Sequence, residues 1–214
     1  MKNLLIPQKT IFEKQRFGNS GDGGYIFAKT PIKNQTIYGF GVDNDITCET
    51  ELQKYFSGAV NLFDGTCYFN KDLPSNITYN KINITKDNIN DILNSNSPMI
   101  VKMDIEGHEF ECLYHMEEKI LQNIEQLIVE FHLNYFNIEY FYNIIFNLNK
   151  THKIFHIHGN NCCGLLNGIP AVIELSFINK KLCNLEENDN NFYPNSKLDF
   201  KNLDDRDELF FKWW

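Results

Sequence analysis

The feature that most constrains this chain is a short, largely apolar run, Met99 to Met103, that leads directly into the acidic segment Asp104 to Glu106. A run of this length and composition is typical of a strand buried on both faces of a parallel sheet. Similar short runs alternate with longer stretches of helical periodicity through the middle of the chain. This alternation predicts an α/β fold, in which helices cover the faces of a mostly parallel sheet.

Periodicity and turn residues predict the other elements. Further strands are expected at Thr36 to Val42, Ala59 to Phe63, Ile77 to Ile84, Ile124 to Phe131, Lys153 to His158 and Ala171 to Ile178. Helices are expected from about Thr47, from Thr85, between Gly107 and Leu121, and from about Asn137 to Leu148. The last two strands are separated by a Gly- and Asn-rich loop that is too short for a helix, so the sheet is expected to end antiparallel.

Length and composition predict one domain. The chain has 214 residues, of which 43% are hydrophobic and 14% aromatic, enough for one sizeable core. Its expected parts are an N-terminal segment over residues 1–35, a core over 36–182 and an acidic, Asn-rich tail over 183–214. The tail ends in aromatic residues between Phe210 and Trp214, which predict that it docks on the domain. The sequence leaves open whether these aromatics form a homodimer contact or a lid.

Charge and targeting signals restrict the partners. Twenty Lys and Arg residues against 28 Asp and Glu residues give a formal net charge of -8. Because this charge repels phosphates, we expect neither nucleic acid nor an anionic membrane surface as a partner. No stretch predicts a signal peptide or a membrane span, which favours a cytoplasmic protein. The six cysteines form no CxxC pair, which argues against a zinc or thioredoxin-type site.

Small and acidic residues follow the first two predicted strands. Ligands of open α/β sheets lie beyond the carboxyl ends of the strands. Gly39 and Gly41 allow a ligand to approach the main chain there, although a tight turn without a ligand has the same residues. Asp64 closes the second strand about twenty residues later, where a carboxylate can accept hydrogen bonds from a ribose diol. Together these residues predict a nucleoside site.

The same turn disfavours a pyrophosphate ligand. Asn44 stands where the third glycine of the dinucleotide fingerprint is expected, and Asp43 and Asp45 flank it. Carboxylates repel phosphates but attract a cation. The turn therefore favours S-adenosylmethionine, a cationic adenosyl ligand without phosphates, over a nicotinamide dinucleotide.

Carboxylates and histidines follow the later strands. Side chains alternate along a strand, so Glu130 and His132 share one face, as do His156 and His158. Oxygen and imidazole groups suit Mg²⁺ or Mn²⁺, and an imidazole also suits a general base. The predicted ligands are Asp104, Glu130, His132 and His158, while Glu106, His156 and Asn160 are predicted to contact the substrate. The alternatives are an ordinary acidic first turn of a helix for Glu106 and simple hydrogen bonding for the last two histidines.

Six stretches, in this order, resemble the FkbM-type, methyltransferase-like branch of the class I S-adenosylmethionine-dependent methyltransferases. They are Asp22 to Tyr25, Ile37 to Glu49, Leu62 to Thr66, Met103 to Leu113, Ile128 to His132 and His156 to Asn161. The resemblance implies a Rossmann-like, doubly wound sheet of seven strands, mostly parallel, with an antiparallel final strand. It covers the chain from about Arg16 to Ile178.

The resemblance also implies roles for individual residues. Gly39, Gly41 and Asp43 would line the methionine side of the cofactor, Asp64 would hold the ribose, and Asp104 would lie beside the transferring methyl group. The segment 1–35 would fold over the cofactor through Asp22, Gly23, Gly24 and Tyr25; the alternative for these four is an ordinary surface turn.

The sequence therefore predicts an S-adenosylmethionine-dependent O-methyltransferase that acts on a hydroxyl of a sugar or sugar nucleotide in surface glycan synthesis. His132 and Asp104 are the predicted catalytic residues, with a divalent metal as a further expected component. A metal-dependent hydrolase would use the same polar groups around a water. A non-catalytic nucleotide- or sugar-binding module would instead pair Asp104 with a structural cation such as Lys102 or Arg16.

Overall fold

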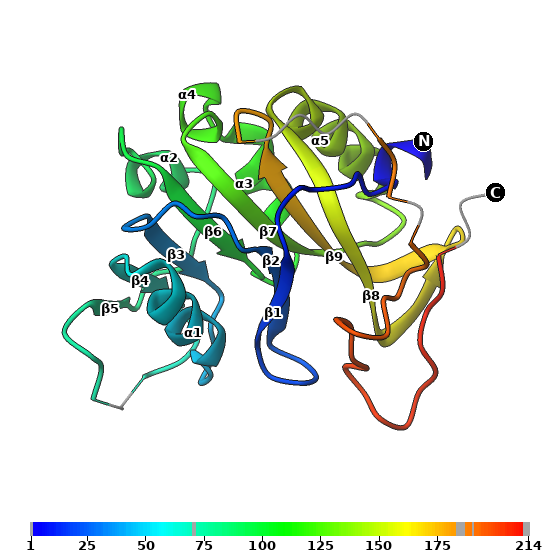
Figure 1. Cartoon of the computed structure of the whole chain (residues 1–214), viewed down its shortest axis with the longest axis horizontal. Coiled ribbons are helices and arrows are strands. Elements are labelled where there is room, and N and C mark those ends of the chain that lie inside the picture. Colours follow the sequence, from blue (N-terminus) through cyan, green and yellow to red (C-terminus); the bar gives the residue numbers. More distant parts are fainter. Residues whose placement is uncertain (1, 70–71, 183–186, 190, 212–214) are drawn as a thin grey trace.

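The computed structural model describes residues 2–69, 72–182, 187–189 and 191–211. Its centre is a seven-stranded sheet in the order β5-β4-β3-β6-β7-β9-β8 (Figure 1). The strands run in parallel except β9, which is antiparallel to both of its neighbours. Their bounds are Thr36–Phe40 for β3, Val60–Phe63 for β4, Ile77–Asn80 for β5, Met99–Met103 for β6, Ile124–His132 for β7, His152–Leu166 for β8 and Ile169–Asn179 for β9. The predicted fold class is confirmed.

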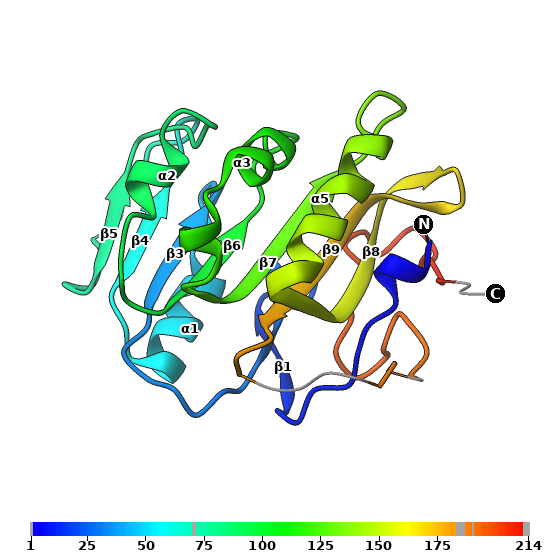
Figure 2. The ribbon, with the colours of Figure 1, turned by 90° about the horizontal axis from the view of Figure 1, so that it is seen from above.

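Helices cover both faces of this sheet (Figure 2). Helix α1 (Thr47–Phe56) packs on one face, and the other helices pack on the opposite face. These are α2 (Ile89–Ile92), α3 (Glu109–His115), α4 (Glu118–Leu121) and α5 (Ile138–Thr151). The 3-10 helix η1 (Lys2–Leu5) packs on the same face. The single helix predicted between Gly107 and Leu121 is thus two, because the chain is extended at Met116 and Glu117. In the described ranges, no helix is long and apolar enough to cross a bilayer.

Strand β6 has the double-sided burial that its sequence predicts. All five of its residues are buried. Met99, Val101 and Met103 belong to the larger core under α3 and α5, whereas Ile100 belongs to the core under α1. Lys102 is buried as well, and its ammonium donates to the carbonyl of Gly41. The first partly exposed residue after β6 is Asp104 at its carboxyl end.

An N-terminal hairpin lies on the same face as α1 and was not predicted as strands. It consists of β1 (Lys14–Gly18) and β2 (Gly24–Ala28), paired antiparallel. The Gln126 side chain of β7 bonds both the N–H and the carbonyl of Ala28, at 2.8 and 2.9 Å. In β9, the Ser176 hydroxyl donates to the carbonyl of Ile26 at 2.7 Å. Polar side chains of the sheet therefore hold the hairpin across β7 and β9.

The Gly- and Asn-rich segment after His158 is a strand, so its prediction as a loop was wrong. β8 continues to Leu166, with shifts of register that accommodate the irregular part. It turns at Asn167 and Gly168, whose φ values are +51° and +78°. Two adjacent residues with positive φ make the turn that fits a tight hairpin, and Asn-Gly is its preferred dipeptide.

The described part of the C-terminal segment lies along β8. Tyr193 and Asp199 are buried there, at 2% and 5% exposure. The last residues of the predicted aromatic tail, Lys212 to Trp214, lie outside the described residues.

Candidate active site

A cleft of about 530 Å³ opens at the carboxyl ends of β3, β4 and β6. Phe63, Ile82 and Ile84 give it an apolar part. Among the described residues that line it there is no lysine or arginine, whereas five carboxylates do so: Asp22, Asp43, Asp64, Asp104 and Glu106. The cleft is therefore strongly anionic, and it favours a cationic ligand with an apolar portion.

Gly39 in β3 and Gly41 just after it allow α1 and the end of β6 to approach the main chain closely at this cleft. Gly41 has a φ of +69°, and a Cβ there would lie 1.6 Å from the carbonyl oxygen of Asp104. A Cβ at Gly39 would lie 2.8 Å from Oε1 of Glu49. The Lys102 ammonium donates to the Gly41 carbonyl at 2.6 Å and fixes the same contact. Gly41 itself lines the cleft.

Asp64 joins the loops after β3 and β4. Its Oδ2 accepts from the N–H groups of Val42 and Asp43, at 3.2 and 2.9 Å. Its Oδ1 accepts from the N–H and hydroxyl of Thr66 and from the N–H of Cys67. Burial raises the pKa of Asp64, but these hydrogen bonds outweigh burial and the pKa lies below its ordinary value. Asp64 is thus an ionised wall of the cleft whose oxygens already have protein partners.

The N-terminal hairpin supplies two more of the predicted residues. Asp22 lines the cleft, and the Tyr25 hydroxyl donates to Oδ2 of Asp104 at 2.9 Å. Gly23 and Gly24 form the turn: Gly23 has a φ of +77°, and a Cβ at Gly24 would lie 2.1 Å from a backbone oxygen. Burial, followed by the Asp104 charge, raises the pKa of Tyr25, so its hydroxyl stays a donor.

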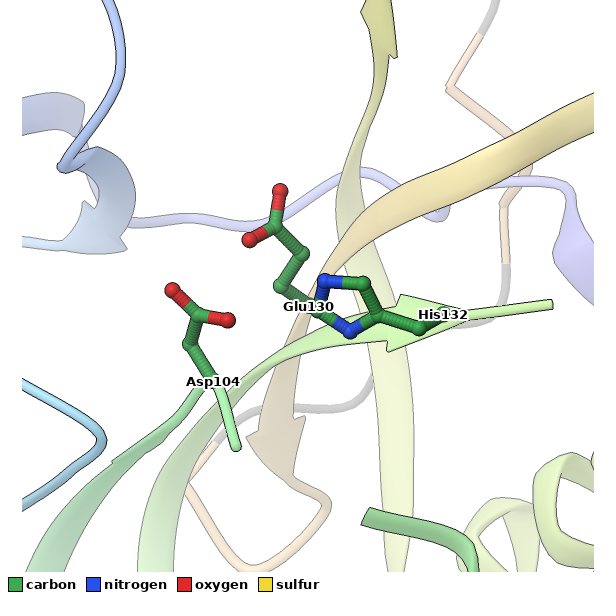
Figure 3. Close-up of side chains that lie close together, drawn as sticks. All are labelled: Asp104, Glu130 and His132. Atoms are coloured by element: carbon green, nitrogen blue, oxygen red, sulfur yellow. The ribbon is translucent and has the colours of Figure 1, made fainter. Parts of the chain in front are cut away.

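Asp104, Glu130 and His132 form one cluster, which we call the open cluster (Figure 3). One potential ligand atom from each residue lies within 4.8 Å of the other two. Oδ1 of Asp104 is buried and has no hydrogen-bond partner among the described residues, while Oδ2 lies 3.8 Å from the Lys102 ammonium. Asp104 therefore has the cationic neighbour expected for a binding module, yet it also lines the cleft.

His132 is oriented by a carboxylate that the sequence interpretation missed. Its Nδ1 lies 3.2 Å from Oε1 of Glu109, which is fully buried and also accepts from the N–H groups of Ile105 and Gly107. Its Nε2 lies 3.3 Å from the exposed carboxylate of Glu106. Burial lowers the pKa of His132, but Glu109, Asp104 and Glu106 outweigh it and hold the pKa above its ordinary value. Glu109 stands two residues after Gly107 in the sequence. This spacing is the one local sign that the Glu109 side chain bonds the turn at Gly107.

Glu130 is held from β8. Asn160 donates to its Oε1 at 2.8 Å, so Asn160 supports the open cluster rather than facing the substrate directly. Burial raises the pKa of Glu130 well above its ordinary value, and the charges of Asp104 and Glu174 raise it further.

The structure does not bring His156 and His158 to the open cluster, in contrast to the prediction. His156 Nε2 lies 2.7 Å from Oδ1 of the buried Asp199. His158 lies between two carboxylates, 3.2 Å from Glu174 and 3.5 Å from Glu208. Both histidines are on the predicted face, but Asp199 and Glu208 of the C-terminal segment cover them. We call this second group the closed cluster.

A family comparison identifies the chain. The model of the Methyltransferase FkbM domain matches residues 13–157, more than half of the sequence. The chain belongs to the FkbM methyltransferase family. The resemblance found in the sequence is therefore confirmed, and so is the prediction of a methyltransferase. The matched residues include Gly39, Gly41 and all three residues of the open cluster.

Solved structures similar to this FkbM methyltransferase are remote in sequence. A putative rRNA-methylase from Clostridium thermocellum is 12% identical with a TM-score of 0.44, covering 69% of this chain and 88% of the other. The fibrillarin pre-rRNA processing protein of Methanococcus jannaschii is 13% identical with a TM-score of 0.43, covering 80% and 84%. An rRNA methylase from Streptococcus thermophilus is 11% identical with a TM-score of 0.41, covering 69% and 89%. No curated protein matches the sequence.

The names of these structures correct one prediction. Nucleic acid was excluded as a partner because the net charge is -8. Two of the three similar structures are named as rRNA methylases, which contradicts this exclusion. Net charge averages over the whole surface, whereas an acceptor is recognised by the groups around one site.

Proposed function

We propose that this FkbM methyltransferase transfers a methyl group from S-adenosylmethionine to a hydroxyl group of a sugar. The observation that carries the proposal is the position of the open cluster: Asp104 lines the anionic cleft and belongs at the same time to the cluster that contains His132. A cofactor in the cleft and an acceptor at His132 would meet at Asp104.

The residues of the cleft fit S-adenosylmethionine. Its carboxylates complement the positive sulfonium and ammonium groups, and their repulsion of phosphates disfavours a dinucleotide. The apolar part at Phe63, Ile82 and Ile84 suits an adenine ring. Asp64 and Thr66 follow Phe63 directly in the lining of the cleft, where the ribose would be held. When bound, the cofactor supplies a methyl group on a sulfonium, ready for in-line attack.

His132 is positioned to take the proton of the acceptor hydroxyl. Glu109 accepts from Nδ1, which leaves Nε2 as the basic nitrogen of the neutral ring. A hydroxyl has a pKa far above neutral, so a base at this point assists the transfer. Tyr25 and Lys102 hold Asp104 beside the reaction point, and Glu106 is an exposed acceptor for further hydroxyls. Carboxylates that bind neighbouring hydroxyls support a sugar as the acceptor.

A divalent metal is the second way in which the open cluster would activate a hydroxyl. Two carboxylates and one imidazole within 4.8 Å suit Mg²⁺ or Mn²⁺, and the unpartnered Oδ1 of Asp104 favours a ligand there. The Glu109 contact to Nδ1 also matches the carboxylate that usually orients a metal-binding histidine. Titration with Mn²⁺, followed by its paramagnetic resonance, distinguishes the two. Binding that Glu130→Gln abolishes supports the metal, whereas no binding at millimolar Mn²⁺ leaves His132 as the base.

Isothermal titration with S-adenosylhomocysteine and with NADH tests the cofactor. We expect micromolar binding of S-adenosylhomocysteine and none of NADH. Asp43→Asn removes one carboxylate of the cleft, and asparagine tolerates the φ of +44° at this position. The control Asp91→Asn makes the same charge change outside the cleft. Binding of NADH, or no binding of either compound, would overturn the proposal.

A further inference from the structure

The loop between β7 and α5 displays two aromatic rings to solvent. Tyr135 is 75% exposed and Phe136 is 99% exposed. The loop follows directly on His132 and projects beyond the end of the sheet (Figure 2). The aromatic residues on either side of it, Phe131 and Phe141, are fully buried. The two exposed rings therefore follow His132 of the open cluster closely along the chain.

Hydrogen bonds fix this loop in its exposed form. The Asn134 side chain accepts from the N–H groups of Phe136 and Asn137, at 2.8 and 3.1 Å. The Asn137 side chain accepts from the N–H of Asn134 at 2.7 Å and donates to the carbonyl of His132 at 3.0 Å. At the other side of the loop, the N–H of Leu133 donates to Ala171 of β9. The backbone is thus closed on itself and tied to His132, and the loop that carries the rings cannot move without losing these bonds.

The exposure of both rings calls for a partner. Single exposed aromatics are common on protein surfaces, but two adjacent rings held outward beside an active site are a favourable contact surface. Phe136 is four residues from His132, so their Cα atoms are within about 14 Å. A ligand of two or three sugar rings spans such a distance.

We infer that Tyr135 and Phe136 form a stacking platform for a sugar ring next to the one that is methylated, so that the acceptor is an oligosaccharide. The inference rests on the proposed function. One face of a pyranose ring carries C–H groups and packs on an aromatic ring, while its edge carries hydroxyls. Glu106, whose side chain is 84% exposed and 3.3 Å from His132, accepts from such hydroxyls. Together with Glu139 in the first turn of α5, Glu106 makes this rim acidic, which favours an uncharged ring over a phosphate-bearing one.

Oligosaccharide binding tests the platform. The probes are oligomers of one, two and three residues of β-1,4-linked glucose, β-1,4-linked N-acetylglucosamine and α-1,4-linked glucose, observed by saturation-transfer NMR in the presence of S-adenosylhomocysteine. We expect at least one trimer to bind more tightly than its monomer. The double variant Tyr135→Ala, Phe136→Ala is expected to weaken the trimer about tenfold or more and to leave the monomer unchanged.

Two controls make the result decisive. Phe192→Ala removes an aromatic that is 82% exposed elsewhere and is expected to change nothing. The conservative double variant Tyr135→Phe, Phe136→Tyr keeps both rings and is expected to bind the trimer as the unchanged protein does. An equal loss in Phe192→Ala, no loss in the double variant, or no binding of any oligomer overturns the platform. The platform is also overturned if the binding of a single-stranded RNA probe depends on the two rings and the binding of the sugars does not. If S-adenosylhomocysteine binds normally in these samples, the platform alone has failed; if it does not bind, the proposed function has failed.

Discussion

The open and closed clusters both contain histidine and carboxylate side chains, yet their surroundings differ. In the open cluster, the His132 side chain is 22% exposed, and Asp104 also lines the cleft. In the closed cluster, His156 and His158 are 2% and 1% exposed, beneath Asp199 and Glu208. Histidine beside carboxylate is therefore open to a ligand in one place and covered by the chain in the other. What decides between them is whether another segment of the chain covers the group.

The largest expected effect breaks the open cluster. His132→Asn removes the proposed base, and methyl transfer is expected to fall by about 10²- to 10⁴-fold. Because the side chain is partly exposed, the free energy of unfolding should change by less than about 1 kcal/mol. Turnover and urea unfolding of the same sample check both parts. If the free energy of unfolding fell as much as it does when a buried ion pair is broken, His132 would also have a structural role.

The second change breaks the closed cluster. Asp199→Ala leaves the His156 imidazole and the N–H of Asn195 without their buried partner. The free energy of unfolding is expected to fall by about 3 kcal/mol, while the folded enzyme keeps its turnover. Urea unfolding measures the loss, with the exposed Asp207→Ala as the control. Lost turnover in a fully folded Asp199→Ala sample would contradict the division between the clusters.

A smaller change separates orientation from basicity in the open cluster. Glu109→Gln keeps an oxygen for the N–H groups of Ile105 and Gly107 but removes the charge beside His132. Since Glu109 raises the pKa of His132, the acid limb of the pH–rate profile should move to lower pH. We expect turnover at the optimum to fall about tenfold. An unmoved acid limb would mean that His132 is not the group that titrates.

The last prediction concerns the pH dependence of stability that the closed cluster produces. Burial lowers the pKa of His158, but Glu174 and Glu208 outweigh it and raise the pKa to about 10. A pKa raised on folding stabilises the protein fully below the unfolded value near 6.5, and this contribution is lost as the pH rises toward 10. His158→Gln should therefore flatten the decline of stability between pH 7 and 10. Thermal unfolding across this range checks it, and an equally steep decline in the variant would refute it.

The parts of the fold that depend on local pattern could be predicted from the sequence. Residues Met99 to Met103 form β6 as expected, because a short and largely apolar run is typical of a strand buried on both faces of a sheet. The hairpin β1–β2 could not be predicted, because Gln126 and Ser176 hold it from far along the chain.

The site divides in the same way. Asp104 follows a buried strand, so its place at the cleft was predictable. The roles of His156 and His158 depend on Asp199 and Glu208, more than forty residues away, and that of Glu109 depends on His132. Alternation along a strand predicts the face of a side chain. It contains no information about which later segment covers that face.

The antiparallel strand β9 also determines when the enzyme can be completed. β9 lies between β7 and β8, although it follows both in the sequence. As the chain leaves the ribosome, β7 keeps an unpaired edge until β9 has been made up to Asn179. Until then, Glu130 on β7 lacks its cross-strand neighbour Glu174. The tight turn at Asn167 and Gly168 lets β8 and β9 pair with each other first and then add to β7 as one unit. A ribosome-bound chain ending before β9 should therefore expose an edge that attracts other strands, and the active site is among the last parts of the molecule to form.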